Sequence, residues 1–536
     1  MNRTALAGLS LFLGALSGCG SREPRFDAAP KLMPPVAVDD HVVLVDTGRS
    51  EARLIDVAGS SPPAASTVVP IVKNATDVQA RNGHSDEALV LCAGQPDVAG
   101  ETAEQPGLVL IDAGGTSTAY RYDSAFDRLV QSDDGRYAFL FFDPAMSGGS
   151  LLKNPNEVAI IDLNSKTAVP ALKTLRSLGE SPRAVAFSQK PASIGGTNRD
   201  LAVVLLDKDV AVIDLSHLDR PEFTVELTKP GGTNLTAAQV LFSTDGAQPN
   251  VYVRADGTDD VFVLSVEPRS SAGADAGTGA DENDFDLTFN QFGMGVGSQP
   301  SDFALFQDGG KTRLLVTGPG NGTAIVVDAD TGDTTAVTLP APASRIHLFT
   351  GPKPSDRTAA TRALLYTPGS SSVVFLDLEG FGSMTNRAGN AELLTLPAPY
   401  ASLAELDDET VMLLNQTSGL NLLKLDERVL SPITGPNLTD AVPDLSVGKL
   451  WLAPPGDDLG YLDLSDFHPN EVRLEDPIEH LVVVPSSSAA HHKVVVTHPS
   501  SIGELTVLDA SDPSNLAVAY MVRDFLFQGV LQGGAR

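Results

Sequence analysis

Two short stretches of the 536-residue sequence carry residue types that bind metal ions. In "DADTGD", at residues 328 to 333, Asp328, Asp330 and Asp333 bring three hard oxygen donors onto one turn, and such donors suit calcium. A calcium loop would usually have a further donor where Gly332 stands and a bidentate acid after it. The alternative at this place is therefore an ordinary hairpin turn.

The second stretch is rich in histidine and lies near the C-terminus. His480 and either His491 or His492 could meet across a hairpin, where they would form a zinc or copper site. His492 and His498 share a strand face in "HHKVVVTH", but they would lie roughly 20 Å apart at about 3.3 Å per residue and cannot share one ion. The alternative is that these histidines are solvated side chains at the rim of the fold.

Motifs for covalent or cofactor chemistry are missing from the sequence. A c-type haem needs Cys-x-x-Cys-His, but the only cysteines are Cys19 and Cys92. There is no Gly-x-Ser-x-Gly, and "GGKT" at residues 309 to 312 lacks the earlier glycine of a phosphate loop, so it predicts a hairpin corner. We predict no catalytic residue and no cofactor, with calcium as the one exception to consider.

Charge excludes one class of partner. The chain has 37 Lys and Arg against 68 Asp and Glu, a formal net charge of −31. A field of that sign repels nucleic acid and anionic headgroups, so nucleic-acid binding is not expected.

The N-terminus predicts export and a lipid anchor. An apolar run from Ala5 to Leu16 follows Arg3, as in a secretory signal peptide over residues 1–18. The next motif, Leu16-Ser17-Gly18-Cys19, resembles the lipobox of bacterial lipoproteins, and the resemblance implies acylation of Cys19 with cleavage before it. Gly20 stands where the family's inner-membrane retention signal would be Asp, which implies the outer membrane, on its periplasmic or surface face. Residues 19–40 would then be a flexible tether.

The elements that must position any site are repeated. Ten apolar runs recur along the chain, mostly 46 to 56 residues apart, and nearly all end in Asp, as in "VAIID" to Asp162 and "VAVID" to Asp214. A second β-rich run precedes each, often after a Ser-x-Asp-Gly corner such as "SDDG" at residues 132 to 135. Continuous apolar runs of this length predict strands buried on both faces. The terminal Asp is expected to accept the backbone N–H two residues on, forming an Asx turn.

Four strands per repeat predict an all-β fold, a β-propeller of about eight to ten blades over residues 41–522, in one or two rings. The order of the "VID" run, a Thr-Gly turn and the Ser-x-Asp-Gly corner resembles the YVTN-repeat propellers of bacterial surface proteins, with a corner similar to TolB-type propellers. We further expect a disordered insertion at residues 270–284, a tail at residues 523–536, and a final strand that completes the first blade.

These features favour a lipid-anchored envelope protein whose propeller is a non-catalytic scaffold that binds another envelope protein or a glycan. One alternative is a propeller-type hydrolase or lyase with its site at the mouth of the channel. Another is an accessory subunit of a secretion or motility assembly.

Overall fold

The computed structural model describes residues 31–526 apart from 98–101, 144–153, 168, 177–180, 189–191, 195–196, 228–234, 244–249, 269–286, 297–298, 319–321, 350–361, 379–390, 408, 435–437, 439, 486–491 and 512–515. Cys19, His491, the predicted insertion and most of the predicted tail lie outside the described residues.

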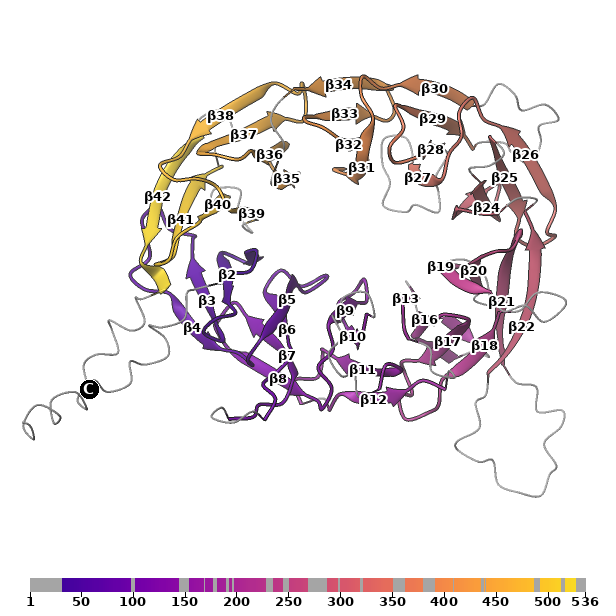
Figure 1. Ribbon diagram of the computed structural model, residues 1–536, viewed down its shortest axis with the longest axis horizontal. Coiled ribbons are helices and arrows are strands. Elements are labelled where there is room, and N and C mark those ends of the chain that lie inside the picture. Colours follow the sequence, from indigo (N-terminus) through magenta and orange to yellow (C-terminus); the bar gives the residue numbers. More distant parts are fainter. Residues whose placement is uncertain are drawn as a thin grey trace, which may run out of the picture. The chain divides into compact units, whose positions relative to one another are not determined.

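The described chain is all-β with almost no helix, and ten four-stranded antiparallel sheets form the blades of a β-propeller (Figure 1). The fold class predicted from the repeats is confirmed. We number the sheets as blades 1 to 10 in chain order. The chain divides into two compact units. The first comprises the described residues up to 80, those of 86–119 and those from 479 on, and the second comprises the described residues of 81–85 and 120–478.

The first unit holds blades 1, 2 and 10. Their strands are β1 (Val36–Val38), β2 (His41–Asp46), β3 (Glu51–Asp56), β4 (Thr67–Pro70), β5 (Ala75–Ala80), β6 (Glu87–Cys92), β7 (Gly107–Asp112), β8 (Ser117–Arg121), β39 (His480–Val484), β40 (Lys493–His498), β41 (Glu504–Asp509) and β42 (Ala517–Arg523).

The second unit holds blades 3 to 9. The strands of blades 3 to 5 are β9 (Arg128–Gln131), β10 (Tyr137–Phe141), β11 (Glu157–Asp162), β12 (Ala171–Thr174), β13 (Ala184–Phe187), β16 (Leu201–Leu205), β17 (Asp209–Asp214), β18 (Phe223–Glu226), β19 (Thr236–Phe242), β20 (Asn250–Asp256), β21 (Asp260–Pro268) and β22 (Leu287–Gly295), with a separate hairpin of β14 (Ala192–Ile194) and β15 (Thr197–Arg199) inside blade 4. The strands of blades 6 to 9 are β23 (Asp302–Asp308), β24 (Lys311–Gly318), β25 (Thr323–Asp328), β26 (Thr334–Thr338), β27 (Arg345–Phe349), β28 (Arg362–Tyr366), β29 (Ser372–Asp377), β30 (Ala391–Thr395), β31 (Tyr400–Glu405), β32 (Thr410–Asn415), β33 (Leu420–Lys424), β34 (Val429–Ile433), β35 (Asp440–Asp444), β36 (Lys449–Ala453), β37 (Asp458–Asp463) and β38 (Pro469–Arg473).

Burial follows the position of a strand in its blade, as the apolar runs predict. Every residue of the second strands β10, β16 and β36 is buried, whereas the fourth strands β12 and β38 alternate between exposed and half-buried residues. The cause is packing between neighbouring blades: apolar side chains of β10 and β11 meet those of β16 and β17 in one core cluster. Cys92 is buried in the core between blades 1 and 2, where a free thiol packs as a small apolar side chain.

The prediction that the last strand completes the first blade is wrong. Blade 1 is built from β1 to β4 alone, and β42 pairs with β41 inside blade 10. The two blades instead pack face to face through a shared core in which Phe525 and Leu526 are 0% and 1% exposed. Both residues fall in the predicted tail, so the folded body extends beyond the predicted boundary at residue 522.

The "GGKT" corner is a hairpin turn. Asp308 pairs with Lys311, and Gly309 and Gly310 between them have positive φ angles of 61° and 80°, which a two-residue hairpin requires. Within the described residues, no helix has the length and apolar character needed to cross a bilayer.

Candidate functional site

The aspartates that end the repeated runs form the turns predicted for them. Six of them accept a hydrogen bond from the backbone N–H two residues on, at 2.9 to 3.1 Å, which caps the strand and begins the next hairpin. This geometry holds for Asp56, Asp162, Asp214, Asp328, Asp463 and Asp509. At Asp112 the carboxylate instead accepts the N–H of Thr116, four residues on. These carboxylates are parts of the framework.

A second recurring feature pairs these aspartates with cations. Lys449 lies opposite Asp463 in register and its Nζ is 2.7 Å from the carboxylate, and Lys493 lies opposite Asp509 at 2.8 Å. Both lysines are buried, at 5% and 2% exposed, so the carboxylate supplies the compensating charge that a buried ammonium needs. These lysines are not among the site residues predicted above, although a basic residue at the start of the β-rich run that precedes the Asp-terminated run, as in "KLWLA" and "KVVVT", is a readable signal.

The turn predicted as a calcium candidate is held by its own hydrogen bonds. One oxygen of Asp328 accepts the N–H groups of Asp330 and Thr331, and the other lies 3.4 Å from Lys311 Nζ and 3.5 Å from Arg313. Asp333 accepts the Thr331 hydroxyl. Burial acts to raise the pKa of Asp328, but these backbone and lysine contacts outweigh it and lower the pKa. Two cationic side chains, Lys311 and Arg313, therefore already lie beside Asp328, the first of the three predicted calcium ligands.

The described histidines of blade 10 that were predicted to bind a metal, His480 and His492, do not lie close together. His480 pairs with Thr497, whereas Val484 pairs with Lys493, so His492 lies at the opposite end of that hairpin. Four or more residues at about 3.3 Å each separate His480 from His492 along the strands, too far for one ion. His492 is buried at 2% exposed. Among the described residues, no group of three or more His, Cys, Asp or Glu side chains is placed to hold a metal ion.

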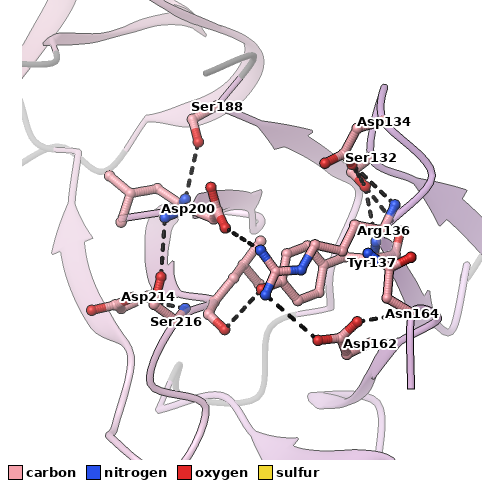
Figure 2. A network of polar contacts seen from close by, with 12 residues as sticks. Ser132, Asp134, Arg136, Tyr137, Asp162, Asn164, Ser188, Asp200, Asp214 and Ser216 are labelled. Atoms are coloured by element: carbon pink, nitrogen blue, oxygen red, sulfur yellow. Dashed lines mark hydrogen bonds and ion pairs between the residues drawn. The ribbon is translucent and has the colours of Figure 1, made fainter. Parts of the chain in front are cut away.

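A polar cavity opens between blades 3 and 4, and Figure 2 shows the network around it. It has a volume of about 150 Å³, and its lining includes Ser132, Asp133, Asp134, Arg136, Ser188 and Asp200. The Ser-x-Asp-Gly corner of blade 3 forms one wall: the Ser132 hydroxyl donates to Asp134 at 2.6 Å and accepts the N–H of Tyr137 at 2.9 Å. Gly135 completes the corner with a φ of 65°.

Arg136 connects the two blades across this cavity. Its guanidinium donates to Asp200 of blade 4 at 2.9 Å, lies 3.6 Å from Asp162 of its own blade, and stacks 4.8 Å above the Tyr137 ring (Figure 2). Asp200 is held in turn, because its N–H donates to Ser216 at 3.2 Å. One cation therefore faces two carboxylates, with Asp133 and Asp134 close by.

The pKa values reflect this excess of negative charge. Burial raises the pKa of Asp200, and the carboxylates of Asp134, Asp214 and Asp162 raise it further against the opposing effect of Arg136. Burial also acts to raise the pKa of Asp134, but hydrogen bonds from Ser132 and the Arg136 N–H outweigh it and lower the pKa. Burial raises the pKa of Tyr137 to about 12. Chemically, the cavity is suited to hold a positively charged group by charge and hydrogen bonds.

Comparison with known proteins finds solved structures of low similarity, with TM-scores of 0.30 to 0.41. No protein-family model matches the sequence, and no curated protein matches it. Among solved structures, a dihydro-heme d1 dehydrogenase NirN in complex with DHE is 12% identical, with 79% of this chain and 83% of that chain covered and a TM-score of 0.40. A eukaryotic initiation factor is 11% identical, with 76% and 89% covered and a TM-score of 0.41. A streptogramin B lyase is 12% identical, with 63% and 96% covered and a TM-score of 0.30.

Proposed function

We propose that this chain is a bacterial envelope lipoprotein, acylated at Cys19, whose propeller is a non-catalytic scaffold for another envelope protein. The observation that carries the proposal is how the recurring carboxylates are used. They cap strands, begin hairpins and neutralise buried lysines, as at Asp463 and Asp509, so the regular polar positions of the repeat build a frame. We therefore place partner binding on the surfaces between neighbouring blades and on the loops that connect the strands.

The cavity between blades 3 and 4 supports a protein partner over a glycan. Arg136 is engaged by Asp162 and Asp200, while Asp133 is exposed at the lining. A basic side chain of a partner would complement this charge, and the net charge of −31 would speed its approach.

Lipid anchoring is tested by the two cysteines. Cells that produce the full chain are fed an alkyne-tagged palmitate, and incorporation and membrane association are followed in Cys19→Ala and, as a matched control, Cys92→Ala. We expect both signals to disappear in Cys19→Ala and to persist in Cys92→Ala. Label that survives in Cys19→Ala would reject the anchor.

Scaffolding is tested by cross-linking the native protein in its own membranes and identifying the linked peptides by mass spectrometry. We expect reproducible links from blade loops to one envelope protein, weakened by Asp133→Lys, which reverses a charge at the cavity without touching the frame. Links that do not exceed background would overturn the protein-scaffold proposal, and unchanged links in Asp133→Lys would remove the cavity from it.

A further inference from the structure

A second cavity, between blades 8 and 9, differs from the first in being apolar. It has a volume of about 200 Å³, and its walls include Leu420, Ile433, Leu452 and Leu462 together with Pro454 and Pro469. Both blades belong to the second unit. In Figure 1, β33 and β34 of blade 8 lie beside β37 and β38 of blade 9. An apolar cavity of about 150 Å³ is enough to admit a benzene ring, so this one holds a single ring with a short substituent.

The cavity exists because one strand lacks a side chain. Gly460 lies in the middle of β37, three residues before Asp463, and it faces blade 8 together with Leu462. The corresponding residue three before the terminal Asp is larger in other blades, for example Ile325 in blade 6 and Val374 in blade 7. A glycine inside a strand weakens it and often marks the close approach of another group.

The edge of this cavity carries negative charge. Asp458 and Glu471 both line it and both are exposed, and Glu471 lies opposite Gly460 in register. Arg473 lies opposite Asp458, but its guanidinium pairs with Asp457 at 3.1 Å. Apolar walls with carboxylates at the opening suit a ligand that has an apolar ring and a cationic end.

We propose that the cavity between blades 8 and 9 is a binding site for a small aromatic amine. The ring lies against the leucine and proline walls above the Gly460 backbone, and the ammonium group lies at Asp458 and Glu471. This site is separate from the cavity between blades 3 and 4 and does not depend on the scaffold proposed above.

The chain supplies its own reporter for this site. Trp451 is the single tryptophan, and it lies on β36 next to β37. Its ring is 5.4 Å from that of Tyr461, and Tyr461 is part of the cavity lining. The full-length protein in detergent is titrated with 2-phenylethylamine, and binding is followed by Trp451 fluorescence and by calorimetry. Butylamine tests the need for the ring, and 2-phenylethanol tests the need for the charge.

We expect saturable binding of 2-phenylethylamine, at least about tenfold weaker binding of butylamine, and about two- to fivefold weaker binding of 2-phenylethanol, as for the loss of a surface ion pair. Glu471→Gln should weaken the binding of 2-phenylethylamine by about two- to fivefold as well. Glu226→Gln, which removes an exposed carboxylate from the fourth strand of blade 4, should leave the affinity unchanged.

The decisive variant is Gly460→Val, which fills the cavity. A Cβ at this position would meet Leu452 Cβ at 3.5 Å and Asn470 O at 3.9 Å, both ordinary contacts, so the variant should fold with an unchanged or raised unfolding midpoint. We expect its affinity for 2-phenylethylamine to fall at least about tenfold. Gly460→Ala, with only the Cβ added, serves if the valine misfolds. Failure of the wild type to saturate at millimolar ligand, or wild-type affinity in the folded variant, would overturn the proposal.

Discussion

At the scale of single residues, the carboxylates of this protein differ mainly in whether a cation has been placed beside them. Asp463 faces a buried lysine, and the hydrogen bonds from Lys449 and Ser465 lower its pKa to about 2. Asp200 faces a guanidinium that it shares with Asp162, and burial with neighbouring acids raises its pKa. Ionised Asp463 therefore stabilises the folded state, whereas ionisation of Asp200 destabilises it.

The pair of Lys449 and Asp463 predicts a specific response to acid. Because the pKa of Asp463 is lower in the folded state, the stability from this pair is complete above the unfolded value near 3.8 and is lost as pH falls through about 2. We expect NMR titration to give a pKa of about 2 for Asp463 in the wild type and a value nearer the ordinary one in Lys449→Met. An unshifted pKa in the wild type would show that the ion pair is not formed in solution.

Removing the cation at Arg136 should destabilise the protein most at neutral pH. Arg136→Met leaves Asp162 and Asp200 without their shared guanidinium, and because the pair is partly exposed we expect a loss of about 1 kcal/mol at pH 7. A carboxyl with a raised folded pKa destabilises the fold once pH rises through that pKa, so the difference from wild type should shrink near pH 4. Urea midpoints at both pH values measure this. A loss of equal size at both would contradict an electrostatic role, and Arg136→Lys should recover part of the loss.

At the scale of elements, the Ser-x-Asp-Gly corner of blade 3 leaves no room for a side chain at its glycine. Gly135 has a φ of 65°, and a Cβ there would lie 2.0 Å from the Asn82 carbonyl oxygen. The Asn82 amide in turn donates to the Ser132 carbonyl at 3.1 Å. The corner thus turns the chain and also contacts the loop that joins β5 and β6.

Two glycines with positive φ angles separate these two roles. Gly257 has a φ of 82° and open space around its would-be Cβ, so Gly257→Ala should cost only the backbone strain, about 1 kcal/mol. Gly135→Ala carries that strain and must also displace backbone, so we expect a loss of several kcal/mol by comparison. Urea denaturation of both variants measures the difference. Equal losses would mean that the Asn82 contact does not form.

Sequence reasoning predicts the parts of this structure that are local and misses those that join distant segments. The strands, corners and Asx turns follow from runs such as "VAIID", because burial on both faces and a turn-forming Asp each leave a readable signal. The contact of Arg136 with Asp200 spans 64 residues, and nothing in either segment specifies it. The apolar cavity likewise depends on which blades adjoin Gly460. The predicted metal sites rest on residue type, which does not determine whether side chains converge.

At the scale of the molecule, the first and last blades are joined without a shared sheet. Arg53 of β3 donates to the carbonyls of Phe525 at 2.8 Å and Leu526 at 2.9 Å, and the same guanidinium pairs with Glu51 at 2.7 Å. Arg53 and Glu51 are only 1% and 4% exposed, so the two carbonyls supply further acceptors to a buried ion pair. The segment at Arg53 and the segment at Phe525 and Leu526, which are far apart in sequence, are thereby held together.

This arrangement predicts that two residues at the C-terminal end of the described chain hold blade 10 in place. A chain that ends at Asp524 loses the burial of Phe525 and Leu526, worth about 3 to 6 kcal/mol for two such side chains, and leaves the Arg53 guanidinium without its carbonyl acceptors. A chain that ends at Leu526 keeps both contacts and is the matched control. Because the change affects one end of blade 10, we would measure hydrogen exchange locally in β41 and β42. We expect faster exchange there in the shorter chain only. Equal protection in both chains would show that blade 10 is held by its strand packing alone.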